Sequence, residues 1–345
     1  MWRARSGKPQ GRPSDPDPPI RLAAAVFVAA LPFPCNTGDD GGTDVGADSG
    51  AATGALTDSE PDDALPDPPG EWDRDDPASV CAVWRYERAL LEEGSWSGDV
   101  ASCSAGDNPQ SRAAALRQIN LMRWLARMPA NVVTTSDRDR AAQQCALMMQ
   151  AQGALSHSPS EAWACHGEHG AEAAAESVLA SAPAGAAIDL FLIDDANEST
   201  LGHRRWLLSN ELREAGIGST ELYSCVWVTE GDGQLVRDWI AWPPPGDVPA
   251  DLMTPSPYSD RGLDDTGWTV QSDTLNLDGA EVRVWDDGVA RTVRTWSLAE
   301  NYGSRSAIAF APVGWRAEAG HDYAVNVTGP GVDIRYGVRL TDCGD

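Results

Sequence analysis

The cysteines constrain the fold of this chain more than any other residue type, because each disulfide forces two segments to lie side by side. The 345-residue sequence contains seven cysteines, at positions 35, 81, 103, 145, 165, 225 and 343. If Cys35 is set aside, an even number remains, which is typical of three disulfides in an exported protein. No two cysteines are spaced as Cys-x-x-Cys, so the sequence does not favour a zinc site made of thiolates.

Six cysteines allow 15 pairings, and the sequence alone does not select one of them. Our prediction has two disulfides that close short loops and a third that joins the two halves of the chain. The predicted pairs are Cys81–Cys103, Cys145–Cys165 and Cys225–Cys343.

The N-terminal segment predicts export. An apolar run of about a dozen residues begins at Leu22, and this is shorter than the roughly 20 residues that span a bilayer. Arg21 and other basic residues precede the run, so we interpret residues 1–34 as a signal sequence. Cys35 then follows, as in the bacterial lipoproteins that this segment resembles, although Pro34 departs from the small residues usual before a lipidated cysteine. The alternatives are plain secretion and an accidental apolar run.

Residues 35–72 are rich in Gly, Asp, Ser, Ala, Thr and Pro and have few large apolar side chains, so we predict a disordered tether. The whole chain has 52 acidic and 26 basic residues, a formal net charge of −26. This charge argues against a nucleic-acid partner, which would need basic side chains to release counterions. It also disfavours an anionic membrane surface, so we expect membrane contact only through a lipid on Cys35.

The next part of the chain alternates between helical and strand-like patterns, which is typical of an α+β fold. Leu116, Ile119 and Met122 recur at helical spacing, and Ser136 with Asp139 forms a capping pattern before a helix that stops at Gly153. The predicted helices are 111–127, 136–152, 184–195 and 200–208. The predicted strands are 215–219, 222–229 and 236–242.

Five short motifs in this part follow one another as in a known family. They are Ile119-Asn120-x-x-Arg123, Ala142-x-x-Cys145-Ala146-Leu147-Met148-Met149, Leu155-Ser156-His157-Ser158-Pro159, Gly202-His203-Arg204 and Ala215-Gly216-Ile217-Gly218. In this order they resemble the CAP superfamily of cysteine-rich secretory, antigen 5 and pathogenesis-related 1 proteins. The resemblance covers residues 108–243 and implies an α-β-α sandwich, which we place within a domain of residues 73–246.

The resemblance implies a cleft with two histidines and two acidic residues that can hold a divalent cation such as zinc. The matching histidines are His157 and His203, and imidazole and carboxylate groups suit such a cation. Glu176 matches the first acid if the register is Glu-Ser-Val; otherwise Ser177 replaces it. Asp194 is our choice for the second acid. Asp195 and Glu198 are alternatives, and a remnant cleft whose histidines only form hydrogen bonds is another interpretation.

Residues 247–345 predict a separate all-β domain. Short alternating strands, with turn residues between them, begin at Trp268 and continue to Leu340. Their number and spacing favour an immunoglobulin-like β-sandwich, and no helical segment is evident in this half. A second histidine cluster, Cys165-His166-Gly167-Glu168-His169, has two glycines close by and is interpreted as a polar loop.

Three hypotheses for the function follow. The first is an exported, lipid-anchored protein that binds an extracellular lipid, glycan or protein at the histidine cleft, with a divalent cation. The second is a metal-dependent peptide or ester hydrolase with Glu176 as base. The third is a surface adhesion module that binds through the β-sandwich. The sequence has no Gly-x-Ser-x-Gly or His-Glu-x-x-His motif, so we expect binding in preference to turnover.

Overall fold

The computed structural model describes residues 69–344, which belong to one compact unit. The predicted signal sequence, the lipidation of Cys35 and the tether up to residue 68 lie outside the described residues. Trp72, at the predicted end of the tether, already packs edge-on against Trp124, with 5.3 Å between the ring centroids. No described helix combines the length and the apolar character needed to cross a bilayer.

The described chain has a mixed α+β fold, as predicted. The helices are α1 (Pro77–Ala89), α2 (Pro109–Leu125), α3 (Ser136–Gln152), α4 (Glu168–Glu176), α5 (Ala184–Ile193), α6 (Gly202–Leu207), α7 (Leu263–Thr266) and the 3₁₀ helix η1 (Ala250–Met253). The strands are β1 (Val133–Thr134), β2 (Ser177–Ala180), β3 (Glu214–Ser219), β4 (Ser224–Trp227), β5 (Ile240–Trp242), β6 (Gly246–Pro249), β7 (Trp268–Ser272), β8 (Glu281–Asp286), β9 (Val289–Arg291), β10 (Val293–Ser297), β11 (Ser306–Pro312), β12 (Asp322–Gly329) and β13 (Val332–Thr341).

Local signals fix the ends of the two longest helices. The side chain of Asn108 accepts a hydrogen bond from the backbone N–H of Ser111, and Pro109 occupies the first turn of α2, where no N–H is needed. Helix α3 ends where Gly153 adopts φ +68°, a left-handed conformation that glycine reaches without steric cost. The predicted helices 111–127 and 136–152 therefore match α2 and α3 closely.

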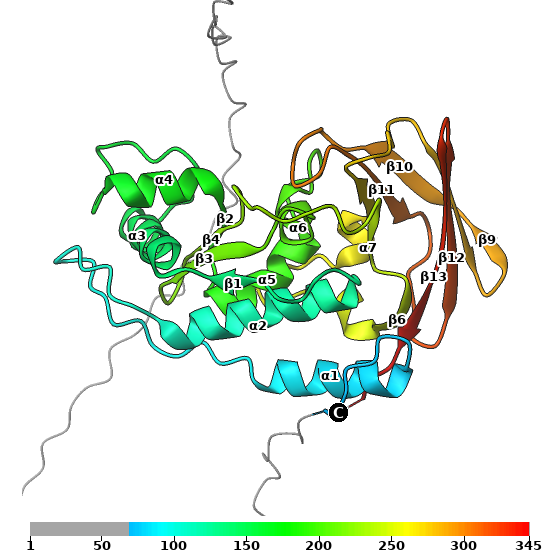
Figure 1. Ribbon diagram of the computed structural model, residues 1–345, viewed down its shortest axis with the longest axis horizontal. Helices are drawn as coiled ribbons and strands as arrows, with labels where there is room; N and C mark the ends of the chain where they lie inside the picture. The colour runs from blue at the N-terminus through cyan, green and yellow to red at the C-terminus, as the bar shows by residue number, and fades with distance from the viewer. Residues whose placement is uncertain (1–68, 345) are drawn as a thin grey trace, which may run out of the picture. The chain divides into compact units, whose positions relative to one another are not determined.

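The first sheet has the strand order β1-β3-β4-β2 and is covered by helices on both faces. On one face, Val178, Ile217 and Val226 share a core with α2 and α5. On the other, Leu179 and Cys225 share a core with α3 and α4. The side chains alternate between faces because successive residues of a strand point in opposite directions. Figure 1 shows this sheet with α3 and α4 on one side and α2 and α5 on the other.

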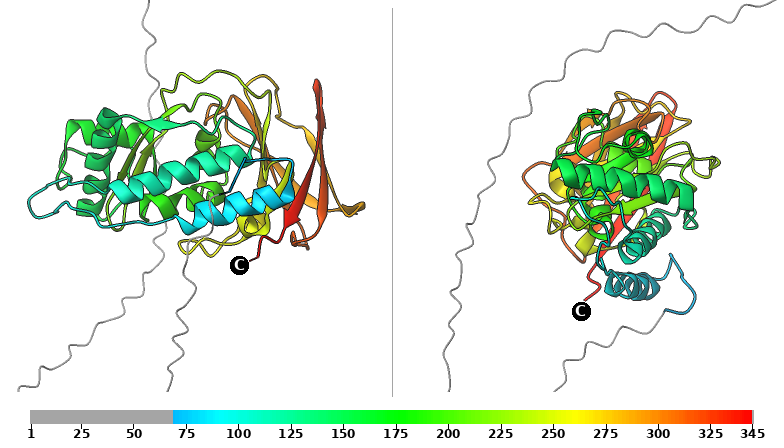
Figure 2. Two further views of the ribbon diagram at one scale, coloured as in Figure 1. Left: turned by 60° about the horizontal axis from the view of Figure 1, so that its bottom comes forward. Right: turned by 90° about the vertical axis from the view of Figure 1, so that its left-hand side faces the viewer.

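The C-terminal half contains two further sheets, with strand orders β10-β11-β7-β5 and β6-β13-β12-β8-β9. Trp268 of the β10-β11-β7-β5 sheet packs against Phe310 of the same sheet and against Tyr323 of the five-stranded sheet, which joins these two sheets in one core. Figures 1 and 2 show β8 to β13, drawn in orange to red, at the end of the unit away from α3 and α4.

Two details of this half differ from the sequence analysis. Two short helices, η1 and α7, lie in the segment that was expected to have none. Each has only four residues, which is too short to give a periodic pattern in the sequence. The boundary predicted between residues 246 and 247 falls inside β6, which pairs in parallel with β13. Strand β5, on the N-terminal side of that boundary, pairs with β7 on the other side.

The six predicted cysteines form three disulfides, but the predicted pairing is wrong. The observed pairs are Cys81–Cys343, Cys103–Cys165 and Cys145–Cys225, with Cα–Cα distances of 5.0, 5.1 and 6.1 Å. Our prediction favoured short loops, whereas tertiary packing decides which cysteines meet. Helix α3 packs on β4, so Cys145 meets Cys225, and the chain after β13 runs along α1, so Cys343 meets Cys81.

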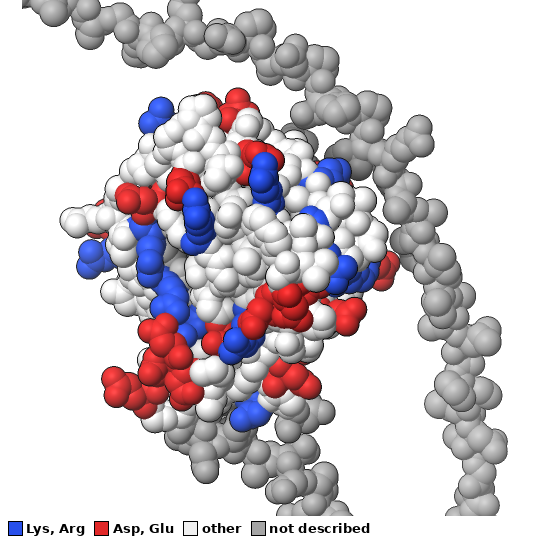
Figure 3. Space-filling model, turned by 90° about the vertical axis from the view of Figure 1, so that its right-hand side faces the viewer, with Lys and Arg blue, Asp and Glu red and all other residues white. Residues whose placement is uncertain are grey.

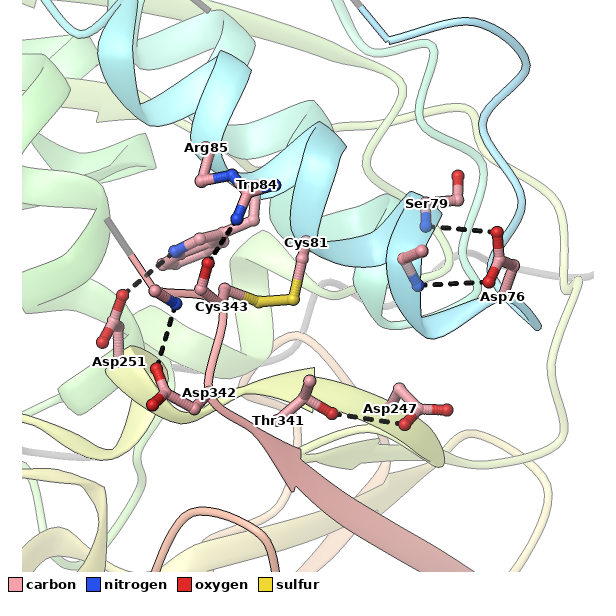
Figure 4. Close-up of a disulfide and its surroundings, with 12 residues drawn as sticks. Asp76, Ser79, Cys81, Trp84, Arg85, Asp247, Asp251, Thr341, Asp342 and Cys343 are labelled. Atoms are coloured by element: carbon pink, nitrogen blue, oxygen red, sulfur yellow. Dashed lines mark hydrogen bonds between the residues drawn. A yellow bond between two sulfur atoms is a disulfide. The ribbon is translucent and has the colours of Figure 1, made fainter.

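Polar contacts support the Cys81–Cys343 junction, which Figure 4 shows. Arg85 donates a hydrogen bond to the carbonyl of Cys343, and the indole N–H of Trp84 donates to Asp251 over 3.2 Å. Asp76 caps α1 by accepting from two backbone N–H groups of its first turn. The two ends of the described unit are therefore joined by a covalent bond and by hydrogen bonds.

The outer face of the five-stranded sheet is polar. Its strands show alternating burial, and three exposed ion pairs lie on them, with nitrogen–oxygen distances of 2.6 to 2.9 Å. Figure 3 shows acidic and basic side chains interspersed on this side of the molecule. The ion pairs are Arg283–Glu281, Arg335–Asp333 and Arg339–Asp322.

Candidate functional site

A cleft of about 580 Å³ lies where the first sheet meets α6 and the C-terminal half. Three of the four predicted site residues line it: His157, Glu176 and His203. The other lining residues are Leu155, Ser156, Ala175, Ser177, Val178, Leu179, Asn197, Thr200, Gly202, Trp206, Val228, Thr229, Asn301 and Tyr302. Residues far apart in the sequence therefore meet around two imidazoles and a carboxylate.

The turn between α5 and α6 positions His203. Asp194 ends α5 with φ +58°, and its fully buried carboxylate lies 3.0 Å from Nδ1 of His203. The same carboxylate accepts hydrogen bonds from the side chain of Asn197 and the backbone N–H of Arg204. The side-chain amide nitrogen of Asn197 also lies 3.1 Å from Nδ1 and 3.5 Å from Nε2 of His203. In the tautomer whose Nδ1 proton is directed at Asp194, Nε2 is the acceptor or metal ligand.

His157 is held in a similar way by the backbone. Its Nδ1 lies 3.0 Å from the carbonyl oxygen of Ala174 in α4, which again leaves Nε2 for a ligand. Glu176, the last residue of α4, accepts a hydrogen bond from the hydroxyl of Thr229. Both histidines thus have an oxygen partner on one ring nitrogen, and the carboxylate of Glu176 lies in the same cleft.

The predicted acid Asp194 does not line the cleft but lies behind His203. The four predicted residues also do not form a compact set of ligands. Within residues 69–344, the one group of three or more His, Cys, Asp or Glu side chains with all ligand atoms within 4.8 Å of one another is Asp286, Asp287 and His321. A cation between His157, Glu176 and His203 would therefore require these side chains to draw together.

The group of Asp286, Asp287 and His321 can hold a metal ion, but it is already paired internally. Nδ1 of His321 lies 2.7 Å from Asp286 and 3.2 Å from Asp287, and Arg291 lies 2.6 Å from the other oxygen of Asp286. The hydrogen bond to Asp286 raises the pKa of His321 above its ordinary value. Burial opposes the ionisation of Asp286, but the hydrogen bonds from His321 and Arg291 outweigh it and lower the pKa of that carboxyl.

Two arginines follow His203; Arg204 was named above only as part of a motif, and neither arginine was given a role. The guanidinium of Arg204 is buried and donates to the carbonyls of Leu192, Ile193 and Gly267. That of Arg205 is also buried and donates to the carbonyls of Ala299 and Ser304. Burial lowers the pKa of each to about 10, so both remain charged at neutral pH. The position of two adjacent arginines directly after a candidate site histidine could have indicated that they stabilise the site.

The loop between β10 and β11 was also missed, although it supplies one wall of the cleft. Asn301 and Tyr302 line the cleft from this loop. The backbone N–H of Ala299 donates to the carbonyl of Ser199, and a Cβ on Gly202 would lie 3.1 Å from the ring of Tyr302. The C-terminal half therefore contributes directly to the candidate site. No local sequence motif predicts this contribution.

The remaining candidate residues lie elsewhere. Asp195 and Glu198 form ion pairs with Arg261 at 2.9 and 3.1 Å and do not line the cleft. His166 lies in a loop, but His169 lies in α4, because Gly167 caps the helix where a loop was expected. The side chain of His169 is 88% exposed, so it faces solvent.

Comparisons of this chain with protein-family models, with curated proteins and with solved structures found no match. The three disulfides are compatible with an oxidising, extracellular compartment.

Proposed function

We propose that this chain is an exported CAP-type protein that binds a ligand in the cleft of His157, Glu176 and His203, with a divalent cation such as zinc. One observation carries the proposal. Each histidine has its Nδ1 3.0 Å from an oxygen atom, that of Asp194 or of Ala174, so Nε2 is the ring nitrogen that would bind the metal. This arrangement is usual for histidines that bind metals, because the oxygen fixes the ring and its tautomer.

The chemistry of the donors supports a borderline cation. Two imidazoles and one carboxylate are a common ligand set for zinc, and such a site leaves one position open for a ligand or water. In this arrangement Asp194 would orient His203 and would not bind the metal. The order of the motifs and the helices on both faces of the first sheet support the CAP-type assignment. Export and a lipid on Cys35 remain part of the proposal.

Zinc titration of the oxidised, full-length chain by calorimetry tests this proposal. We expect micromolar or tighter binding by the wild type and loss of that binding in His157→Ala/His203→Ala. Asp194→Asn should weaken zinc binding by about 10- to 100-fold, because the orienting carboxylate is lost while the side-chain shape is kept. Asp195→Asn is the matched control, since its carboxylate pairs with Arg261 outside the cleft.

Two outcomes would reject the metal part of the proposal. The first is no binding by the wild type. The second is binding that survives in the double histidine variant but disappears in His321→Ala, which would place the ion at Asp286 and Asp287 instead.

A metal-dependent hydrolase is the second candidate, because Glu176 lines the same cleft as both histidines and can take a proton from an attacking water. Hydrolysis of peptide or ester substrates that disappears in Glu176→Gln, with zinc still bound, would favour it.

A further inference from the structure

Strand β2 forms the free edge of the first sheet, and this edge runs along the cleft. It is last in the strand order β1-β3-β4-β2 and pairs with β4 on one side. Three of its residues, Ser177, Val178 and Leu179, line the cleft, although each is at least nine-tenths buried. A free strand edge normally presents a row of unpaired backbone groups to its surroundings.

The hydrogen-bond pattern identifies which backbone groups are unpaired. The backbone N–H of Val228 donates to the carbonyl of Glu176 over 3.1 Å, so these two residues form a hydrogen-bonded pair. Hydrogen-bonded and non-bonded pairs alternate along an antiparallel ladder. Val178 is therefore bonded to Val226, whereas Ser177 and Leu179 direct their N–H and C=O groups away from β4. Within residues 69–344, no loop, cap or side-chain hydrogen bond reaches these four groups.

These groups define the kind of ligand that would complete the sheet. As whole residues Ser177 and Leu179 are only 4% and 5% exposed, and both line the cleft. Backbone groups at such a position are costly to leave without a partner, and a ligand in the cleft would supply one. Two donors and two acceptors repeat at a spacing of two residues, and this is the pattern of an extended peptide backbone. A glycan or a lipid chain has no matching repeat, whereas strand addition to a sheet edge is a common mode of peptide recognition.

We propose that the cleft binds an extended peptide segment that pairs with β2 at Ser177 and Leu179 and lies beside His157 and His203. This inference rests on the proposed binding function of the cleft and names its ligand class. Successive side chains of the peptide would point to opposite faces of the extended sheet. Those on the cleft side would contact apolar groups from Leu155, Trp206 and Tyr302.

The charges in the cleft favour a basic peptide. Glu176 forms no ion pair with any residue in the described part of the chain, and the chain as a whole has a net charge of −26. A lysine or arginine in the peptide would pair with Glu176 when no cation occupies the cleft. We therefore expect basic peptides to be enriched over acidic ones in the metal-free protein.

Binding of a peptide library to the metal-free, oxidised full-length chain tests the proposal. The probe is a randomised library of acetylated, amidated pentapeptides, with retention measured by mass spectrometry. Leu179→Pro removes a free N–H without removing a ladder bond, and proline is tolerated on strand edges. We expect it to reduce retention by about tenfold, the effect of one buried hydrogen bond. Leu179→Ala loses the same side chain but keeps the N–H, so it should retain the peptides.

A second measurement needs only the wild type and keeps the test decisive if Leu179→Pro does not fold. A library of the same composition with every amide nitrogen methylated cannot donate to the edge, so it should not be retained. Equal retention of both libraries, retention of neither, or unchanged retention by a folded Leu179→Pro would overturn the peptide proposal. Zinc titration is measured separately: zinc binding without peptide binding rejects this inference alone, and peptide binding without zinc binding rejects the metal alone.

Discussion

At the scale of single residues, the contact between His203 and Asp194 identifies which of the nearby acids orients the histidine. The histidine was recognisable from its motif, but the role of the carboxylate was not, because Asp194, Asp195 and Glu198 all precede it by a few residues. The left-handed conformation of Asp194 turns its side chain inward to His203, while Asp195 and Glu198 pair with Arg261. Spacing along the chain does not distinguish these three acids; backbone conformation does.

His321 makes the stability of the C-terminal half depend on pH. Its pKa is raised by the hydrogen bond to Asp286, so it binds its proton more tightly in the folded state than in the unfolded state. The resulting stabilisation is fully present below the unfolded pKa of about 6.5 and is lost as pH rises through the higher folded value. In His321→Gln we therefore expect a lower melting temperature than in the wild type at about pH 5, and a smaller difference at about pH 9.

His169→Gln serves as the control for this measurement, because its side chain is 88% exposed and lies 3.8 Å from Glu172. It should have little effect at either pH. A melting-temperature difference for His321→Gln that grows with pH would contradict the assignment of His321 as a protonated partner of Asp286.

Among the elements, the loop between β10 and β11 receives several of its hydrogen bonds from one buried side chain, that of Arg205. Arg205 donates to the carbonyls of Thr200, Ala299 and Ser304, and these oxygens lose their partner if the guanidinium is removed. We expect Arg205→Met to lower the free energy of unfolding by about 2–4 kcal/mol, because buried acceptors are left unpaired. Urea denaturation measures this loss, and hydrogen exchange should show reduced protection in residues 299–304.

Arg294→Met is the matched control. Arg294 is exposed and stacks over Trp296 at 4.4 Å, a contact worth about 0.5–1 kcal/mol at such a position. If both variants lose the same stability, the loop does not depend on Arg205.

Some helices and strands could be predicted from their local sequence and others could not. Helix α3 was predicted with the correct length and terminal glycine, but the predicted Ser136 cap is wrong: Ser136 is the first helical residue, and the residue before it, Thr135, makes no side-chain capping hydrogen bond. Helix α4 and strand β2 were not predicted, since the Ala-rich segment from Glu168 to Ala180 has no periodic pattern and passes from helix to strand without a turn residue. The element that borders the cleft was therefore the one whose sequence carried the least information.

At the scale of the whole molecule, we expect the stabilisation from each disulfide to increase with the length of the loop that it closes. Cys81–Cys343 joins residues 262 positions apart, whereas Cys103–Cys165 joins residues 62 apart. We expect Cys81→Ser/Cys343→Ser to cost about 3–5 kcal/mol and Cys103→Ser/Cys165→Ser to cost less, because longer loops lose more entropy when closed. Urea denaturation of both oxidised variants gives the comparison, and peptide mapping of the wild type checks the pairing. A larger loss for Cys103→Ser/Cys165→Ser would contradict this order.

The sequence by itself determined the α+β class, the limits of α2 and α3, most C-terminal strands and the six bridging cysteines. These features follow from local periodicity, capping and composition, which neighbouring residues are enough to establish. Tertiary structure alone decided the pairing of the cysteines, the place of Asp194 behind His203, the arginine contacts and the wall supplied by Tyr302. Each of these depends on segments that are distant in the sequence, and the packing of sheets and helices brings them together.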